Sequence, residues 1–238
     1  MPDIFVNSFQ VYADWKNKTG TEIRITKFSE IGATGNTPDV IKNYISSIYT
    51  TWVEVPTHVL LIGDAGVAPH KMFASNYDSY TFPNEDYFVE IEGNDFFPEM
   101  MIGRFTNQED YRLQVIVSKM LRYERDPERV DNAWYKKGIV CSNDAYESQV
   151  EVKRYTAELM RDSGNFTSVD TMMSKNPCLY DLDDVIAAIN AGRGFLNYRG
   201  EGWTTGWWAS CTPFQTENVN SLNNGSKLTF VTSIGCGV

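Results

Sequence analysis

The chain has 238 residues and a formal net charge of −10, with 42 % hydrophobic and 13 % aromatic residues. This composition is that of a globular protein with one large domain or two small ones, and it excludes a disordered chain. The acidic balance argues against a nucleic-acid partner, because phosphate binding needs clustered Lys and Arg. No apolar run is long enough to cross a bilayer, so no membrane span is expected. Residues 1–3 lack the basic and apolar start of a signal peptide, so none is predicted.

The first half of the chain alternates between predicted helices and strands. Hydrophobic spacing predicts a helix over Phe9–Lys18, a strand over Glu22–Lys27, a helix from Thr37 to Ile48 and a buried strand over Thr57–Asp64. A further strand over Met100–Phe105 is followed by a helix that Asn107 caps and that runs to Arg125. This alternation predicts crossover connections and a mostly parallel sheet.

The second half repeats the theme after a polar, proline-containing segment, Arg125–Asn132. That segment is the candidate boundary, giving a first domain of residues 1–128 and a second of residues 129–238. The predicted strands are Gly138–Ser142, Phe166–Met173, a run from Phe195 and Leu228–Cys236. The predicted helices are Glu147–Asp162, Asp181–Ile189 and Thr212–Leu222.

Two of these strands end in small residues, which points to a site. Phe195–Trp203 and Leu228–Cys236 are apolar, β-favouring runs that pass into glycine. Ligands bind at the carboxyl ends of strands in open α/β sheets, and glycine lets a backbone approach a ligand closely. Glu201 and Cys236 are therefore expected on loops at one sheet rim. The alternative is two core strands with ordinary loops.

The same two stretches resemble the catalytic segments of the gingipain family. They contain Asn197-Tyr-Arg-Gly-Glu-Gly-Trp203 and Phe230-Val-Thr-Ser-Ile-Gly-Cys236. Gingipains are cysteine peptidases; in the first segment they carry the catalytic histidine, and the second ends in the nucleophile. Cys236 falls on that nucleophile, whereas Glu201 falls on the histidine. Further landmarks occur in the family's order across the chain, at residues 13–17, 59–64, 93–95, 102–105 and 123–125.

The resemblance implies an α/β fold of the caspase-like kind, with a mostly parallel sheet flanked by helices and two side-by-side α/β subdomains. The family continues well beyond its cysteine. The second subdomain is therefore expected to be incomplete here, its closing part carried by a downstream fragment of the same precursor. A truncated chain is the alternative. The resemblance also implies a secreted or cell-surface protein that acts on protein or peptide substrates.

The resemblance implies that Cys236 is the nucleophile and that the backbone N–H groups of Gly202 and Cys236 stabilise the oxyanion. Cys236 is alternatively a buried structural thiol. Asp144 matches the acid that assists the histidine, or it is a loop aspartate that makes a local turn. Glu201 is a poor replacement for histidine, because a carboxylate opposes thiolate formation and cannot protonate a leaving amine at neutral pH.

The expected function is thus a cysteine endopeptidase domain with little or no activity as written. The alternative is a non-catalytic pseudo-peptidase that binds peptides or acts as a scaffold. Trp203 and its tryptophan neighbours can hold an extended peptide or pack in the core. Gln149 stands where arginine-specific gingipains carry an acid, so arginine specificity is not expected. A nucleotide-binding domain is a third interpretation, without GxGxxG or Walker support.

Two histidines and a calcium site complete the candidates. His58 is expected to be a core histidine, and His70 lies in a loop that can reach a strand-end site. The resemblance implies structural calcium, with Asp86 and the stretch that contains Asn107, Glu109 and Asp110 as ligands. The alternative is that Asn107 caps a helix and the acids favour its dipole. The four cysteines form no CxxC pair, and disulfides are possible but not indicated.

Overall fold

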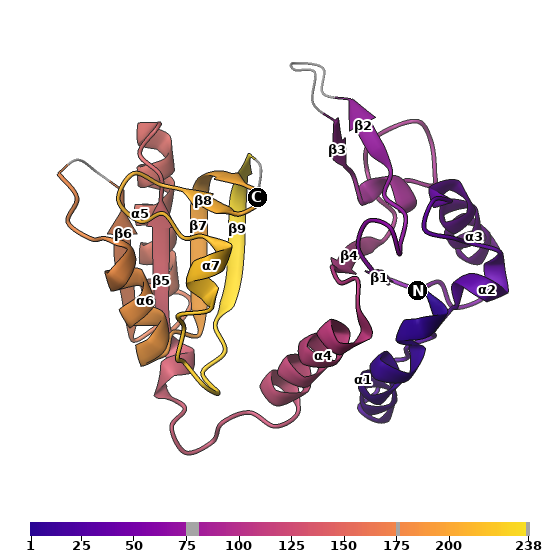
Figure 1. Ribbon diagram of the computed structural model, residues 1–238, viewed down its shortest axis with the longest axis horizontal. Helices are drawn as coiled ribbons and strands as arrows, with labels where there is room; N and C mark the ends of the chain where they lie inside the picture. The colour runs from indigo at the N-terminus through magenta and orange to yellow at the C-terminus, as the bar shows by residue number, and fades with distance from the viewer. Residues whose placement is uncertain (75–80, 175–176, 237–238) are drawn as a thin grey trace. The chain divides into compact units, whose positions relative to one another are not determined.

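A computed structural model describes residues 1–74, 81–174 and 177–236 (Figure 1). The chain divides into two compact units, Met1–Leu121 and Arg122–Val238. Each unit combines helices with strands, and the longer strand pairs are parallel. The predicted α/β fold with mostly parallel sheets flanked by helices is confirmed. The division falls within the last turn of a helix, whereas the predicted boundary lies in the polar segment after it.

The first unit is built around a short parallel strand pair. Its elements are η1 (Asp3–Phe5), α1 (Val6–Lys18), α2 (Phe28–Ile31), α3 (Pro38–Thr51), β1 (His58–Ile62), β2 (Met72–Ala74), β3 (Thr81–Pro83), η2 (Asp86–Phe88), β4 (Met101–Phe105) and α4 (Asp110–Glu124). β1 pairs with β4 in parallel, and β2 pairs with β3 in antiparallel fashion. Leu61 packs with α3, whereas its neighbour Ile62 packs with α1 and α4. Successive side chains of β1 thus anchor helices on opposite faces.

The second unit holds a five-stranded sheet. Its elements are η3 (Ala133–Lys136), β5 (Lys137–Ser142), α5 (Glu147–Asp162), β6 (Ser168–Met173), α6 (Leu182–Ala191), β7 (Phe195–Trp203), β8 (Gly206–Trp208), α7 (Thr216–Val219) and β9 (Phe230–Cys236). Hydrogen bonds link the strands in the order β6-β5-β7-β8, and β9 also pairs with β7 (Figure 1). All pairs are parallel except β7 with β8.

Helices cover both faces of this sheet, as the side chains of β5 show. Ile139 and Cys141 pack in a core with α6, whereas Val140 packs in a second core with α5. All three side chains are almost fully buried. This explains why the strand reads as a continuous apolar run, since each face of a central parallel strand meets a helix.

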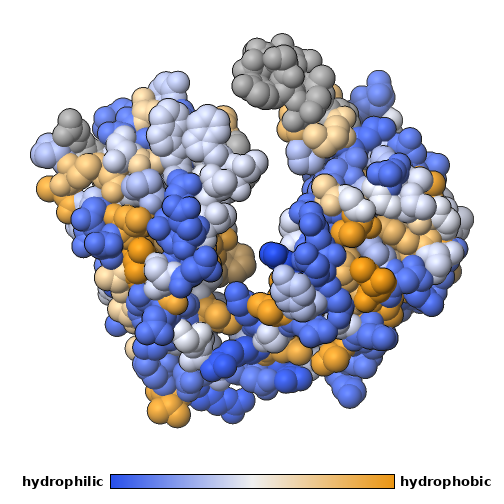
Figure 2. All heavy atoms as spheres, in the orientation of Figure 1, coloured by the Kyte–Doolittle hydropathy of each residue, from blue (hydrophilic) through white to orange (hydrophobic). Residues whose placement is uncertain are grey.

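The second unit also contains a disulfide bond. Cys178 and Cys211 form a disulfide, which the sequence did not indicate, with their Cα atoms 5.5 Å apart. Figure 2 shows hydrophilic and hydrophobic residues intermixed on the visible face of each unit. Within the described residues, no helix combines the length and the apolar character needed to cross a membrane.

In the first unit, one predicted strand and the predicted burial of one histidine are wrong. Residues 22–27 do not form a strand. Ile23 and Ile25 pack against the core of α1 and α4, and the side-chain oxygen of Asn17 accepts the Ile23 N–H at 2.6 Å. The alternation therefore reflects a half-buried extended segment that has no neighbouring strand. His58 is exposed, not buried, because β1 lies in a sheet of only two strands.

In the second unit, the predicted helix over Thr212–Leu222 is reduced to α7. The residues before it pair with β8 instead, through the bridge between Gly206 and Gln215. Glu201 and Cys236 lie within β7 and β9, not on loops, because β8 extends the pairing of β7 to Trp203.

Val140→Ala is expected to lower the free energy of unfolding by about 2–3 kcal/mol, from lost burial and the cavity left between β5 and α5. Val130→Ala is the matched control, since Val130 is 96 % exposed, and it should change stability by less than about 0.5 kcal/mol. Urea denaturation followed by circular dichroism measures both. Equal effects of the two substitutions would contradict the described core.

Candidate active site

The parallel pairing of β7 with β9 sets the geometry of the candidate site. Its register runs from Phe195 opposite Phe230 to Glu201 opposite Cys236. Neighbouring strands lie about 4.8 Å apart, so the carboxylate and the thiol project side by side from one face of the sheet. Cys236 is exposed and Glu201 is half-buried. The alternative that Cys236 is a buried structural thiol is therefore wrong.

Glycine is required just before this pair of residues. Gly200 lies opposite Gly235, and a Cβ atom added to Gly235 would collide with the carbonyl oxygen of Gly200. The backbones of β7 and β9 therefore approach each other at this point as only glycine allows. The glycines noted in the sequence thus favour the register in which Glu201 lies opposite Cys236.

An aromatic platform supports the other face of the same strand ends. The ring of Tyr198 stacks on that of Trp207, with centroids 4.3 Å apart, and burial raises the pKa of its hydroxyl. That hydroxyl donates to the carbonyl oxygen of Glu201 at 2.6 Å. Trp207 Nε1 donates to Ser233 Oγ of β9 at 2.8 Å. The platform thus ties β7, β8 and β9 together beneath the site.

The other predicted catalytic groups lie near this sheet edge, but their roles stay predictions. Asp144 follows β5, which pairs with β7, and its carboxylate accepts a hydrogen bond from Ser210 Oγ at 2.9 Å. Within the described residues, no hydrogen bond or ion pair joins Asp144 to Glu201 or Cys236. Gly202 is buried in β7, opposite Trp207 of β8.

The two predicted substrate-binding residues differ in environment. Trp203 is 61 % exposed, and its ring lies 5.9 Å from that of Trp208, which is 54 % exposed. Trp208 lies opposite Glu201 across β8, so both tryptophans share the face of Glu201 and Cys236. Gln149 in the first turn of α5 is 8 % exposed, and its Oε1 has no hydrogen-bond partner.

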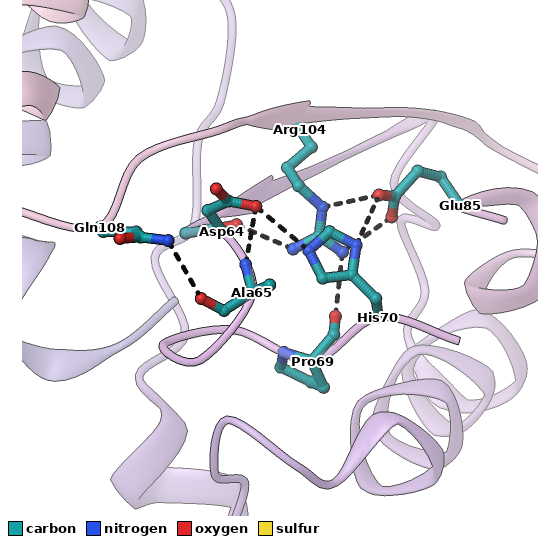
Figure 3. Close-up of polar contacts among 8 residues, drawn as sticks. Asp64, Ala65, Pro69, His70, Glu85, Arg104 and Gln108 are labelled. Atoms are coloured by element: carbon teal, nitrogen blue, oxygen red, sulfur yellow. Dashed lines mark hydrogen bonds and ion pairs between the residues drawn. The ribbon is translucent and has the colours of Figure 1, made fainter. Parts of the chain in front are cut away.

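The first unit contains a polar network around His70 that the sequence did not reveal. Figure 3 shows the imidazole between two carboxylates, with Nε2 3.6 Å from Asp64 and Nδ1 3.6 Å from Glu85. Arg104 donates two hydrogen bonds to Glu85, at 2.6 and 2.8 Å, and others to the carbonyl oxygens of Gly63 and Pro69. All these partners belong to the first unit, so the network acts there as a link between β1, β4 and their loops.

The predicted calcium ligands do not form a cluster. Asp86 is exposed, in η2, and within the described residues no group of three acidic, histidine or cysteine side chains could hold a metal ion. Asn107 is 3 % exposed with both side-chain polar atoms unpartnered, so it does not cap α4. Asp110 accepts hydrogen bonds from Ser8 and Gln114 through Oδ2, while its Oδ1 is buried without a partner. Buried, unpartnered oxygens suit a hard cation, but calcium takes about six to eight of them.

Comparison with known proteins assigns the family. The sequence model described as Peptidase family C25 matches residues 1–238. The chain belongs to peptidase family C25. Gingipain R2 of Porphyromonas gingivalis is 26 % identical over 243 aligned positions, which cover 99 % of this chain and 31 % of that protein. Lys-gingipain of the same organism is 24 % identical over 94 % of this chain and 13 % of its own length.

Solved structures of gingipain R share this fold. The crystal structure of the Arg-specific cysteine proteinase gingipain R matches with a TM-score of 0.84 and 22 % identity. The match covers 99 % of this chain and 53 % of that one. A complex of the RgpB pro- and mature domains from Porphyromonas gingivalis gives the same TM-score. The resemblance to gingipains is thus confirmed at the level of family and fold, and the chain spans about half of the solved relative.

Iodoacetamide is expected to label Cys236 alone in the folded, unreduced protein. Cys178 and Cys211 are joined, and burial, with a smaller effect of Asp170, raises the pKa of Cys141 to about 12. Cys141 therefore stays protonated and shielded at mildly alkaline pH. Mass spectrometry should find one adduct, none in Cys236→Ser, and four after unfolding with reduction. Native labelling of Cys141 would contradict the described burial.

Proposed function

We propose that this chain is a gingipain-type cysteine endopeptidase domain, with Cys236 as nucleophile, whose activity is impaired by Glu201. The observation that carries the proposal is the placement of Glu201 directly opposite Cys236 at the sheet edge. An exposed thiol with glycine-flanked backbone beside it suits attack on a peptide carbonyl. A carboxylate carries no proton to return to the leaving amine, whereas an imidazolium does.

The predicted roles of the remaining groups form part of this proposal. The backbone N–H groups of Gly202 and Cys236 stabilise the oxyanion, and Asp144 is the acid that would orient an imidazole at position 201. The location of Asp144 after β5, beside β7, supports its role. The substrate is a protein or peptide, which the similarity to a cysteine proteinase of known structure supports.

A secreted or cell-surface location is the next part of the proposal. The disulfide between Cys178 and Cys211 supports it, because such bonds persist in oxidising surroundings. A downstream fragment of the same precursor is the proposed partner of β9. Within the described residues β9 pairs only with β7, and Val231 and Ile234 are each 49 % exposed. An open strand edge with apolar side chains is a template for another strand.

A second function, peptide binding without catalysis, is favoured by the two exposed tryptophans. Trp203 and Trp208 lie on the face of Cys236 and are large enough to hold an extended peptide. Loss of catalysis through Glu201 would leave this surface intact.

Glu201→His is expected to raise peptide hydrolysis by about 10²–10⁴-fold, the usual contribution of a positioned general acid–base. Glu201→Gln is the matched control: it removes the charge without supplying an imidazole, and it should stay at background. Adding Cys236→Ala to Glu201→His should abolish the gain. Cleavage through Cys236 by the unaltered protein would refute impairment. A histidine variant that stays at background would show that Glu201 is not what limits activity.

Structural calcium is proposed at Asn107 and Asp110, supported by their unpartnered buried oxygens, while the third predicted ligand, the exposed Asp86, has no such support. Calcium at about 100 times its Kd should raise the free energy of unfolding by about 2.7 kcal/mol. Asp110→Asn should reduce that gain, whereas Asp14→Asn, at an exposed position of α1, should not. Melting curves with calcium and with EDTA provide the measurement; identical curves would rule the site out.

A further inference from the structure

Two cationic side chains lie on the face of the sheet that carries Glu201 and Cys236. Lys153 of α5 is 2 % exposed, and its Nζ donates to Asn197 Oδ1 of β7. Asn197 in turn donates to Thr232 Oγ1 of β9 at 2.5 Å. Alternate residues of a strand share a face, so Arg199 points to the same side as Asn197, one step nearer to Glu201.

Neither cation has an anionic partner within the described residues. No ion pair is formed by Lys153 or Arg199, and Arg199 Nε is buried without an acceptor. The pKa of Lys153 is lowered by its burial and, to a smaller degree, by the charge of Arg199. A buried lysine and a half-buried arginine that repel each other, with the Nε donor of the arginine unused, favour a bound anion.

The first turn of α5 lies at the level of Arg199. α5 follows β5 and crosses back to β6, so it runs against the strands, and Lys153 lies over Asn197. Four residues of helix and two of strand each span about 6–7 Å, which brings Gln149 to the level of Arg199. The Oε1 of Gln149 is buried without a partner, and a half-turn of the amide places its NH2 group there instead. The positive end of the helix dipole favours an anion there as well.

We propose that Arg199, Lys153 and Gln149 form a subsite that binds the carboxylate of an acidic side chain, Asp or Glu, of a peptide. Arg199 lies two residues before Glu201 on the same face of β7, a distance of about 7 Å. One side chain of a peptide that lies over the thiol of Cys236 can span this distance. The inference rests on the proposed peptidase-type site and names its substrate class. The charges that line the subsite are positive, so the subsite favours an acidic side chain over a basic one.

Peptide binding tests the subsite without requiring catalysis. Tetrapeptide amides that differ only in one residue, Asp, Asn or Arg, are titrated into the protein and into Cys236→Ser by calorimetry. The Asp peptide should bind about tenfold more tightly than the Asn peptide, which has the same shape but no charge, and both should exceed the Arg peptide. A free carboxyl terminus on the Asn peptide should not restore the difference, which separates side-chain recognition from terminal recognition.

Variants locate the effect. Arg199→Gln should bring the Asp-to-Asn ratio to about one, Arg199→Lys should keep most of it, and Arg154→Gln, at an exposed arginine of α5, should leave it unchanged. A ratio of one in the unaltered protein, a preference for Arg, or no binding of any peptide overturns the proposal. A ratio that appears only in Glu201→Gln also overturns it, because the carboxylate of Glu201 would then be the occupant. Failure of Glu201→His to cleave peptides leaves the binding ratio standing, so the two proposals fail separately.

Discussion

The close approach of β7 and β9 at Gly200 and Gly235 is the constraint on which the candidate site depends. At one end of the strand pair the rings of Phe195 and Phe230 stack with centroids 5.8 Å apart. At the other end Trp207 donates to Ser233. Between these two ends, Gly200 and Gly235 let the backbones of β7 and β9 come closer than a side chain at position 235 would permit. Since a slip of one residue turns every side chain of a strand to the opposite face, this register decides whether Cys236 and Glu201 meet at all.

The chemistry of the site follows from alternate positions of one strand. Asn197, Arg199 and Glu201 project from the same face of β7, so that face carries an amide, a cation and an anion in sequence. The anion is nearest to the thiol, where a peptidase needs a group that accepts and returns a proton. The cation lies one step further in, next to the buried Lys153. The thiol of Cys236 is thus separated from the positive charges of Arg199 and Lys153, and those charges suit the binding of an anion better than proton transfer.

Local patterns predicted the elements that are buried on two sides or clearly capped. α5 has the predicted bounds, and β5 differs by one residue. The spacing of apolar residues in an amphipathic helix, or their continuous run in a central strand, directly reflects which faces of the element are buried. The strand over Glu22–Lys27 failed since alternation reports burial of one face and not the presence of a neighbouring strand. The disulfide joins cysteines 33 residues apart, a separation with no sequence signature. Lys153 reads as a surface lysine of an acidic helix, and only the packing of α5 on β7 buries it.

Family membership and catalytic competence have different physical requirements, which is why the first does not establish the second. The fold needs glycine at positions 200 and 235, apolar side chains along β5 and β7, and the aromatic stack under the strand ends. None of these depends on which side chain stands at position 201, because Glu201 is half-buried and its backbone carbonyl, not its carboxylate, accepts the hydrogen bond from Tyr198. A carboxylate and an imidazole can therefore occupy the same place in the same fold, while only the imidazole supports the proton transfers of peptide hydrolysis. In the proposed function, the side chain at position 201, and not the backbone, decides whether the domain cleaves peptides or only binds them.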